Sequence, residues 1–272
     1  MAQDQERPAN EAAWYSHSPS SIFPSSHTFH YFTNKCSAGP TVLFIHGLPG
    51  HREVGFQRDA ARYLAKEGIA QSVRYDLDRN SKQWERSKDN RGLLGSIAQL
   101  KSFSYVTFQD HCDDLLQRLQ HTSSSQPERP IILAAHSYGA MLALYAVAHT
   151  DTFPDITGVF LSNPFITKSF RHHFLSGFEG MPNPQQSLEH AASYNGSIAI
   201  LYDQYDQLVP SRNNAIQILR SRQSAGLSTQ SRIYNSVRPD HDFIKPDSRE
   251  KYVSDLAEFV KSITPQEPNP AA

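Results

Sequence analysis

Residues 130–144 read PIILAAHSYGAMLAL and decide the fold. The apolar run rich in Ile and Leu predicts a buried strand, and the Ala, Leu and Met residues after Gly139 predict a helix. Only a few residues separate the two elements, so Ser137 lies on a very sharp strand-to-helix turn. Such a turn strains the serine backbone and requires small residues two positions before and two positions after it. Ala135 and Gly139 meet that requirement.

This turn would place Ser137 where a nucleophile is needed. It exposes the hydroxyl at the carboxyl end of a central strand, beside the free N–H groups of a helix that can stabilise a developing oxyanion. The pattern small-x-Ser-x-Gly is weak by itself, and the strand before it and the helix after it make it informative. The alternative is an ordinary serine in a turn.

A second tight turn follows another apolar strand. Residues 41–45, TVLFI, are apolar on both faces and predict a central strand, which leads directly into HGLPG at residues 46–50. Its glycines and proline let the backbone turn tightly and leave the amide of Leu48 free to face a ligand. We predict this amide as one oxyanion donor and the amide of Tyr138 as the other. His46, Gly47 and His136 are possible substrate-pocket residues.

The composition indicates one α/β domain. At 272 residues the chain can bury a large core, and its net charge of −1 with mixed signs gives no footprint for nucleic acid or an anionic membrane. No apolar leader or 18-residue apolar run occurs, so we expect neither secretion nor a membrane span.

Cys36 and Cys112 form neither a disulfide framework nor a metal-ligand pattern, which favours a cytoplasmic protein with reduced thiols and no metal. No dinucleotide fingerprint or P-loop occurs, so no cofactor is expected. The sequence says nothing about oligomeric state.

Strands and helices alternate along the rest of the chain. We expect the segments 28–33 and 41–45 to pair as a hairpin that opens the sheet, and Thr107 with Asp110 to form a capping box at a helix start. The alternation predicts a mostly parallel central sheet with helices on both faces. The domain would span residues 28–263, between flexible tails at 1–27 and 264–272. The other predicted helices are 56–66, 212–221 and one ending near 263, and the other predicted strands are 71–75, 156–164, 197–202 and 232–234.

Two stretches interrupt the alternation. Residues 77–102 carry mixed charges without helical or strand periodicity, which predicts a solvent-exposed loop. The alternative is a mobile loop at the edge of the active site, with Trp84 as a contact residue. Residues 165–196 predict a small helical cap, an apolar and aromatic insert. Phe165, Phe170 and Phe174 in it would either line a substrate pocket or only pack the insert on the domain.

Four motifs occur along the chain, each after a predicted strand, and their order is informative. His46-Gly47 follows an apolar strand, the Ser137 turn follows the next central strand, Asp206 precedes a Val-Pro step after the next-to-last strand, and His241 lies in His-Asp-Phe after the last. Over residues 28–263 the chain resembles the α/β-hydrolase-fold serine hydrolases, whose catalytic order is Ser, acid, His. The resemblance implies the triad Ser137, Asp206 and His241. Asp203 on the same loop is a rival acid, but the family places the acid just before the Val-Pro step.

The chemistry explains why such residues are needed. A serine hydroxyl is a weak nucleophile at neutral pH unless a base accepts its proton, and an imidazole can accept that proton and return it to the leaving group. The acid holds the imidazole in one tautomer and stabilises its cation. Ser137 would attack, His241 would shuttle the proton and Asp206 would orient the imidazole. Asp240 and Asp242 flank His241 and would either tune it or be solvated loop carboxylates.

The leading functional hypothesis is hydrolysis of a carboxylic ester or thioester of a small-molecule acyl substrate, through an acyl-enzyme on Ser137. The same triad would also serve an enzyme similar to the serine aminopeptidases, or a carbon–carbon bond hydrolase. A hypothesis of another class is a non-catalytic ligand-binding protein on the hydrolase fold, because fold alone does not give function.

Overall fold

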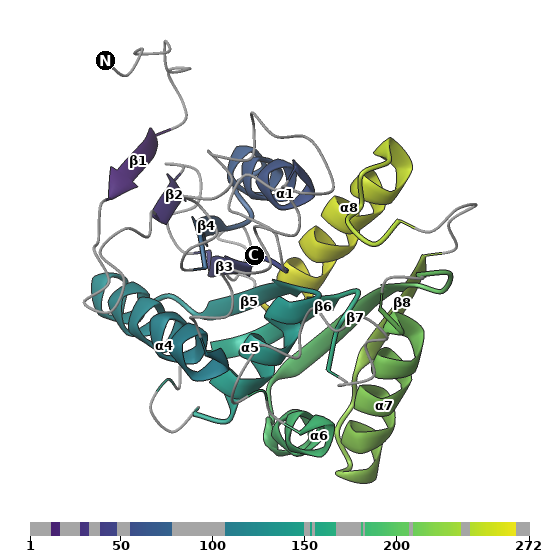
Figure 1. Ribbon diagram of the computed structural model, residues 1–272. Coiled ribbons are helices and arrows are strands. Elements are labelled where there is room, and N and C mark those ends of the chain that lie inside the picture. Colours follow the sequence, from purple (N-terminus) through teal and green to yellow (C-terminus); the bar gives the residue numbers. More distant parts are fainter. Residues whose placement is uncertain are drawn as a thin grey trace, which may run out of the picture.

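The backbone is organised around one sheet with helices on both faces (Figure 1). The computed structural model describes residues 39–47, 55–77, 107–149, 153, 156–166, 181, 183–206, 209–234 and 240–264, and the backbone of 12–16 and 28–32. Within these residues eight strands pair in the order β1-β2-β4-β3-β5-β6-β7-β8. The strands are β1 (Ala12–Ser16), β2 (Thr28–Phe32), β3 (Thr41–Ile45), β4 (Gln71–Tyr75), β5 (Ile131–His136), β6 (Ile156–Ser162), β7 (Ser197–Asp203) and β8 (Gln230–Tyr234).

The six strands β3 to β8 are parallel, as the alternating sequence predicts, whereas β1 and β2 extend one edge in the antiparallel sense. The predicted hairpin between residues 28–33 and 41–45 is wrong, because β2 pairs with β4. Both edges of β3 are already occupied: Val42 lies opposite Ser72 of β4 and Ile132 of β5. A strand that is apolar on both faces belongs between two parallel neighbours, so β2 is left with the outer edge of β4.

The stretch predicted as an amino-terminal tail contains a strand. β1 lies within residues 1–27 and pairs with β2 over its whole length, from Ala12 opposite Phe32 to Ser16 opposite Thr28. Trp14 and Tyr15 favour extended backbone. The tail prediction is therefore corrected for residues 12–16.

Helices cover the two faces of the sheet and confirm the predicted fold class (Figure 1). Alternate residues of each central strand point to opposite faces: Leu43 and Ile45 join one core cluster, and Val42 and Phe44 join the other. One face carries α1 and α8, and the other carries α4, α5, α6 and α7. The helices are α1 (Gly55–Lys66), α4 (Phe108–Ser125), α5 (Tyr138–Val147), α6 (Pro184–Ser193), α7 (Ser211–Ser224) and α8 (Pro246–Ile263).

The capping box predicted from the sequence is found at the start of α4. Thr107 and Asp110 form the expected capping box, in which each side chain accepts the backbone N–H of the other residue. Gly68, with φ of 68°, follows the end of α1. Cys112 of α4 is fully buried in the core.

Part of the predicted cap belongs to the helical layer. α6 lies within residues 165–196 and packs beside α5 and α7. Residues 167–180, with Phe170 and Phe174, lie outside the described part of the chain, as do residues 78–106 with Trp84. The cap and the mobile loop therefore stay predictions.

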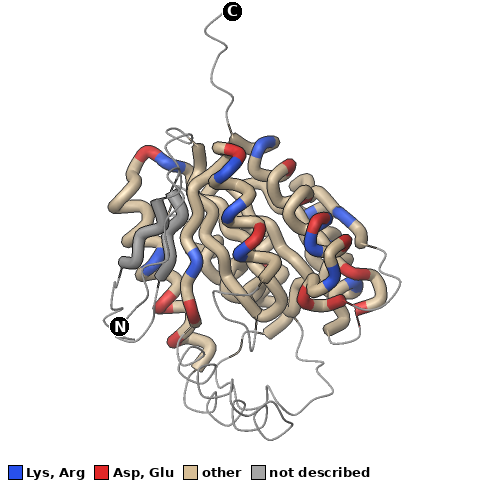
Figure 2. Tube along the Cα trace, turned by 90° about the horizontal axis from the view of Figure 1, so that it is seen from above, with Lys and Arg blue, Asp and Glu red and all other residues tan. Residues whose placement is uncertain are grey.

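Charged residues of both signs are interspersed along the described helices (Figure 2). This distribution agrees with the mixed charges of the sequence. None of the described helices combines the length and the apolar character needed to span a bilayer.

A buried arginine joins α6 and α7 to the residues just before β7 and β8. Arg222 of α7 is almost fully buried. Its guanidinium donates to four backbone carbonyls and one hydroxyl: Ala191 O at 2.8 Å, Tyr194 O at 2.6 Å, Gly196 O at 2.9 Å, Ser228 O at 3.1 Å and Thr229 Oγ1 at 2.7 Å. A buried carbonyl without a donor is costly, so the arginine holds this corner of the domain together.

We expect Arg222→Met to lower the free energy of unfolding by about 2–4 kcal/mol, because it leaves several carbonyls without a donor. Urea unfolding followed by circular dichroism measures the loss. Arg220→Met on the exposed side of the same helix is the matched control and should change stability by less than about 0.5 kcal/mol. Equal effects of the two changes would contradict this role of Arg222.

Candidate active site

Ser137 lies on the predicted sharp turn between β5 and α5. Its backbone has φ of 51° and ψ of −118°, a conformation that non-glycine residues rarely adopt and that fits the expected strain. The Ser137 N–H donates to Ser162 O at 3.0 Å, and its carbonyl accepts from the N–H of Phe165 at 3.1 Å. These bonds hold the strained residue to the end of β6.

The turn is possible because two glycines allow close backbone contacts. A Cβ at Gly139 would lie 2.6 Å from the carbonyl oxygen of Ile45, so only glycine lets α5 pass over the end of β3. A Cβ at Gly47 would lie 2.8 Å from Cβ of Ser137. The loop after β3 therefore packs directly against the serine.

His46 holds this loop through its backbone. Its Nε2 accepts the N–H of Leu77 at 3.0 Å, so the ring proton is on Nδ1, which donates to the carbonyl of Gly47 at 2.8 Å. The side chain is buried. This placement favours a structural role for His46 over pocket lining, whereas Leu48, the predicted oxyanion donor, lies outside the described residues.

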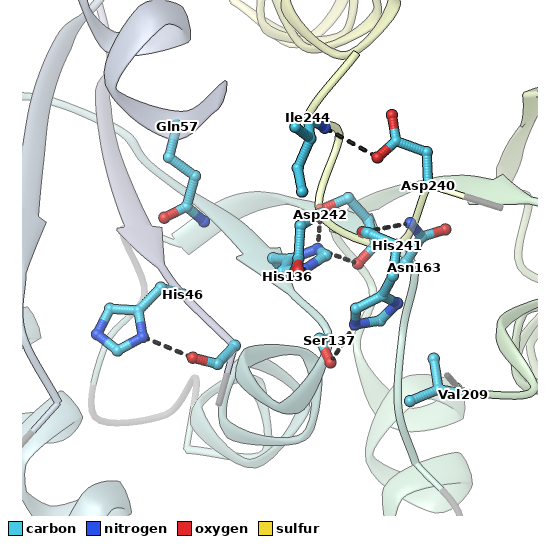
Figure 3. A network of polar contacts seen from close by, with 12 residues as sticks. His46, Gln57, His136, Ser137, Asn163, Val209, Asp240, His241, Asp242 and Ile244 are labelled. Carbon is cyan, nitrogen blue, oxygen red and sulfur yellow. Dashed lines mark hydrogen bonds and ion pairs between the residues drawn. The ribbon is translucent and has the colours of Figure 1, made fainter. Parts of the chain in front are cut away.

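Three side chains predicted from distant parts of the sequence form one hydrogen-bonded chain. His241 Nε2 lies 2.9 Å from Ser137 Oγ, and His241 Nδ1 lies 2.6 Å from Asp206 Oδ2. Figure 3 shows the imidazole beside the serine at the carboxyl ends of the strands. Because the carboxylate only accepts, Nδ1 carries the proton and Nε2 is left to accept the serine hydroxyl. The arrangement can remove a proton from Ser137.

The geometry separates the two rival acids. Asp206 is held by the N–H of Val209 at 3.3 Å and by the hydroxyl of Ser211, and it faces His241. Asp203 is fully buried, and its carboxylate accepts the N–H groups of Tyr205 at 2.9 Å and Asp240 at 2.8 Å. Asp203 thus joins two loops, and Asp206 contacts the imidazole.

His241 and Asp206 each stabilise the charged form of the other. Burial lowers the pKa of His241, but the hydrogen bond and negative charge of Asp206 outweigh burial and raise that pKa above the ordinary value of 6.5. For Asp206, burial raises the pKa, while the hydrogen bond and charge of His241 bring it below the ordinary value of 3.8. Asp206 therefore stays ionised at neutral pH and favours the imidazolium form of His241.

Asn163 is a site residue that the sequence analysis missed. It follows β6 with φ of 42°, and it is fully buried. Its side-chain amide donates to the carbonyl of His241 at 2.7 Å and accepts the N–H of Asp203 at 2.7 Å. Asn163 thus bridges the loops of the acid and of the histidine. The only local signal is an Asn-Pro step at the carboxyl end of a buried strand.

The carboxylates that flank His241 have different tasks (Figure 3). Asp240 is only 5% exposed and accepts the N–H groups of Ile244 at 2.9 Å and Lys245 at 3.0 Å, together with the hydroxyl of Ser248. It therefore caps the start of α8, and the expectation of a solvated carboxylate is wrong for Asp240. The side chain of Asp242 is 53% exposed, and its Oδ1 lies 3.3 Å from His136 Nε2.

The remaining predicted site residues take several positions. His136 is buried and stacks edge-on against Phe56, with ring centroids 5.0 Å apart. Phe165 is buried in a core cluster, and the hydroxyl of Tyr138 lies 2.9 Å from His111 Nδ1. Tyr138 is the first residue of α5 and directly follows the serine. The position directly after the nucleophile keeps its amide as the predicted oxyanion donor.

Among the described residues, one cluster has the side chains that a metal ion would need. Ligand atoms of His136, His241 and Asp242 lie within 4.8 Å of one another. The ring nitrogens of both histidines already make hydrogen bonds with protein atoms. These hydrogen bonds are sufficient to explain why the three side chains lie close together.

The chain is similar to known proteins in sequence and in fold. Its residues 37–187, more than half of the 272, match the family model described as "Serine aminopeptidase, S33". The comparison with curated protein sequences found no match.

Many solved structures share the fold. The dienelactone hydrolase of Anabaena variabilis is 16% identical with a TM-score of 0.62, covering 94% of this chain and 98% of its own. The Pyrobaculum calidifontis esterase is 16% identical with a TM-score of 0.66, covering 92% of this chain and 85% of its own. The Pyrococcus horikoshii acylaminoacyl peptidase is 10% identical with a TM-score of 0.67, covering 97% of this chain and 43% of its own. At these identities the likeness extends to the fold alone.

We expect Asn163→Gly to lower the free energy of unfolding by about 1–3 kcal/mol, because two buried hydrogen bonds are lost. Asn163→Ala should cost about 1 kcal/mol more, since alanine also has to adopt the positive φ. Urea unfolding measures both variants against the unmodified protein. If the alanine variant were as stable as the glycine variant, the backbone at residue 163 would not be strained.

Proposed function

Because the chain belongs to the serine aminopeptidase S33 family and has the α/β-hydrolase fold, we propose that it hydrolyses a carboxylic ester or thioester through an acyl-enzyme on Ser137. One observation carries this proposal: the unbroken chain of hydrogen bonds from Asp206 through His241 to Ser137, with the serine on the strained turn before α5.

In the first half of the proposed reaction, Ser137 Oγ attacks the carbonyl carbon of the substrate and its proton moves to His241 Nε2. The amide of Tyr138, and that of Leu48 as the sequence predicts, would stabilise the negative oxygen of the tetrahedral intermediate. The intermediate collapses, the bond to the alcohol or thiol breaks, and His241 gives its proton to that leaving group.

In the second half, water attacks the acyl-enzyme. His241 Nε2 accepts a proton from the water as its oxygen bonds to the acyl carbon, and then returns the proton to Ser137 Oγ as the acyl–serine bond breaks. The products are a carboxylic acid and the restored serine. Asp206 keeps its negative charge throughout and stabilises the imidazolium in both halves.

The names of the similar proteins favour two substrate classes. Two of the similar structures are a dienelactone hydrolase and an esterase, which favours an ester. The family description names an aminopeptidase, and another similar structure is an acylaminoacyl peptidase. An amide bond next to a free or acylated amino terminus is therefore the second candidate, and it would use the same residues.

We expect a fluorophosphonate to label the folded protein with one adduct per chain on Ser137, because the hydroxyl is activated by His241. Intact-mass spectrometry and peptide mapping measure the adduct. Ser137→Ala should carry none, and should lower kcat/KM by about 10⁴–10⁶-fold on any substrate that the protein cleaves. Absence of an adduct on the folded protein would contradict the proposed hydrolase activity and favour a non-catalytic ligand-binding protein.

A panel of p-nitrophenyl esters, acyl thioesters, and aminoacyl and acylaminoacyl p-nitroanilides separates the substrate classes. Turnover of the esters or thioesters that is lost in Ser137→Ala is expected. Turnover confined to the anilides would replace the ester proposal by the peptidase one.

The pH dependence should follow His241, which must be neutral to accept a proton. Since the pKa of His241 is raised above 6.5, mainly through its hydrogen bond to Asp206, kcat/KM should fall as the pH drops through a midpoint above 6.5. Asp206→Asn should move this acid limb to lower pH and reduce kcat by about 10⁴-fold, because the favoured tautomer is lost. Initial rates between pH 5 and pH 9 measure both effects.

The control is Glu189→Gln, an exposed charge on α6, which should keep the acid limb of the unmodified enzyme. A wild-type rate and acid limb in Asp206→Asn would contradict its role as the orienting acid.

A further inference from the structure

A second aspartate–histidine contact lies beside the proposed triad. His136 directly precedes Ser137, and Asp242 directly follows His241. The carboxylate of Asp242 lies 3.3 Å from His136 Nε2, next to the bond between His241 and Ser137 (Figure 3). The turn that carries the serine and the loop that carries the histidine are therefore joined at two adjacent positions.

The His136 ring is a fixed support for this contact. It is buried and packs against the rings of Phe56 at 5.0 Å and Phe243 at 6.0 Å between centroids. With the ring proton on Nε2 facing Asp242, Nδ1 can only accept, and the hydroxyl of Ser162 lies 3.3 Å from it. Only Nε2 faces the loop of His241, so that a side chain bound there is held in place.

The two imidazole rings are in contact. The centroid of His136 lies 4.9 Å from that of His241, with the ring planes tilted by 47°. A sideways movement of His241 toward β5 would meet the His136 ring. The ring therefore restricts the positions that His241 can adopt beside Ser137.

The charge of Asp242 remains available to His241. Burial lowers the pKa of His136, so this ring is neutral at neutral pH and does not cancel the carboxylate. Partial burial acts to raise the pKa of Asp242, but its hydrogen bond to His136 outweighs this effect and lowers the pKa, so Asp242 stays ionised. The other charged or titratable groups that act on His241 are Asp206 and Asp203 from the loop after β7. Asp240 of its own loop is bound to the start of α8.

We propose that Asp242 is a positioning residue, which through His136 holds the His241 imidazole against Ser137 and through its charge favours the imidazolium formed during the reaction. The inference rests on the proposed function, in which His241 is the base. Asp242 does not contact the reacting atoms, so it acts through His241.

Two substitutions separate the charge of Asp242 from its contact. In Asp242→Asn the side-chain carbonyl can still accept the Nε2 proton of His136, but the negative charge is gone. The acid limb of kcat/KM should move to lower pH by about half a unit to one unit, because an exposed carboxylate is partly screened. Asp242→Ala should show the same shift and a further fall of about tenfold in kcat with KM unchanged, because the contact is also lost.

Glu250→Gln removes an exposed charge from α8 and should keep the acid limb of the unmodified enzyme. Acid limbs of Asp242→Asn and Asp242→Ala that coincide with the wild type would overturn the effect of charge. A kcat of Asp242→Ala equal to that of Asp242→Asn would overturn the positioning.

A measurement without turnover keeps this inference apart from the proposed function. NMR titration of the ring of His241 in folded Ser137→Ala protein, with and without Asp242→Asn, should show a lower pKa in the double variant. An unmoved His241 titration would overturn the inference about Asp242. A wild-type protein without a phosphonate adduct on Ser137 would overturn the proposed function instead.

Discussion

The close contact between α5 and the end of β3 is the constraint on which the site depends. With Gly139 the helix can begin directly after Ser137, because no side chain separates its backbone from the carbonyl of Ile45. The serine is then forced to φ of 51° at the carboxyl edge of the sheet. A second close contact brings Gly47 against Ser137, so the loop proposed to bind the oxyanion lies directly beside the nucleophile.

Buried polar groups transfer this fixed position to the other loops. Asn163 bonds to the backbones of Asp203 and His241, and Asp203 bonds to the backbone of Asp240. These hydrogen bonds join the backbone of the loop that carries Asp206 to the backbone of the loop that carries His241. Hydrogen bonds are stronger in a buried environment of low dielectric, so the geometry is set before a substrate arrives. Preorganised groups need little rearrangement when charge develops in a reaction.

Sequence reasoning succeeded where the signal is local. The strand, sharp turn and helix around Ser137 follow from residues that are neighbours in the chain, as does the capping box of Thr107. It failed where the outcome depends on distant partners. The predicted hairpin between residues 28–33 and 41–45 was wrong because β4 and β5 occupy both edges of β3. The bridging role of Asn163 likewise depends on loops that are far away in the sequence, and no residue pattern near Asn163 specifies its partners.

The division of labour between Asp240 and Asp242 follows from how their loop is anchored. Asp240 is bound by the backbone amides that begin α8, so its charge is offset by the amino end of a helix. Phe243, at φ of 48°, is buried against Phe56 and Tyr252 with ring centroids 5.3 Å away in both cases. Because both ends of the turn are fixed to the core, His241 and Asp242 are the two side chains between them that reach the Ser137 turn. The start of α8 therefore decides which carboxylate can act on the imidazole.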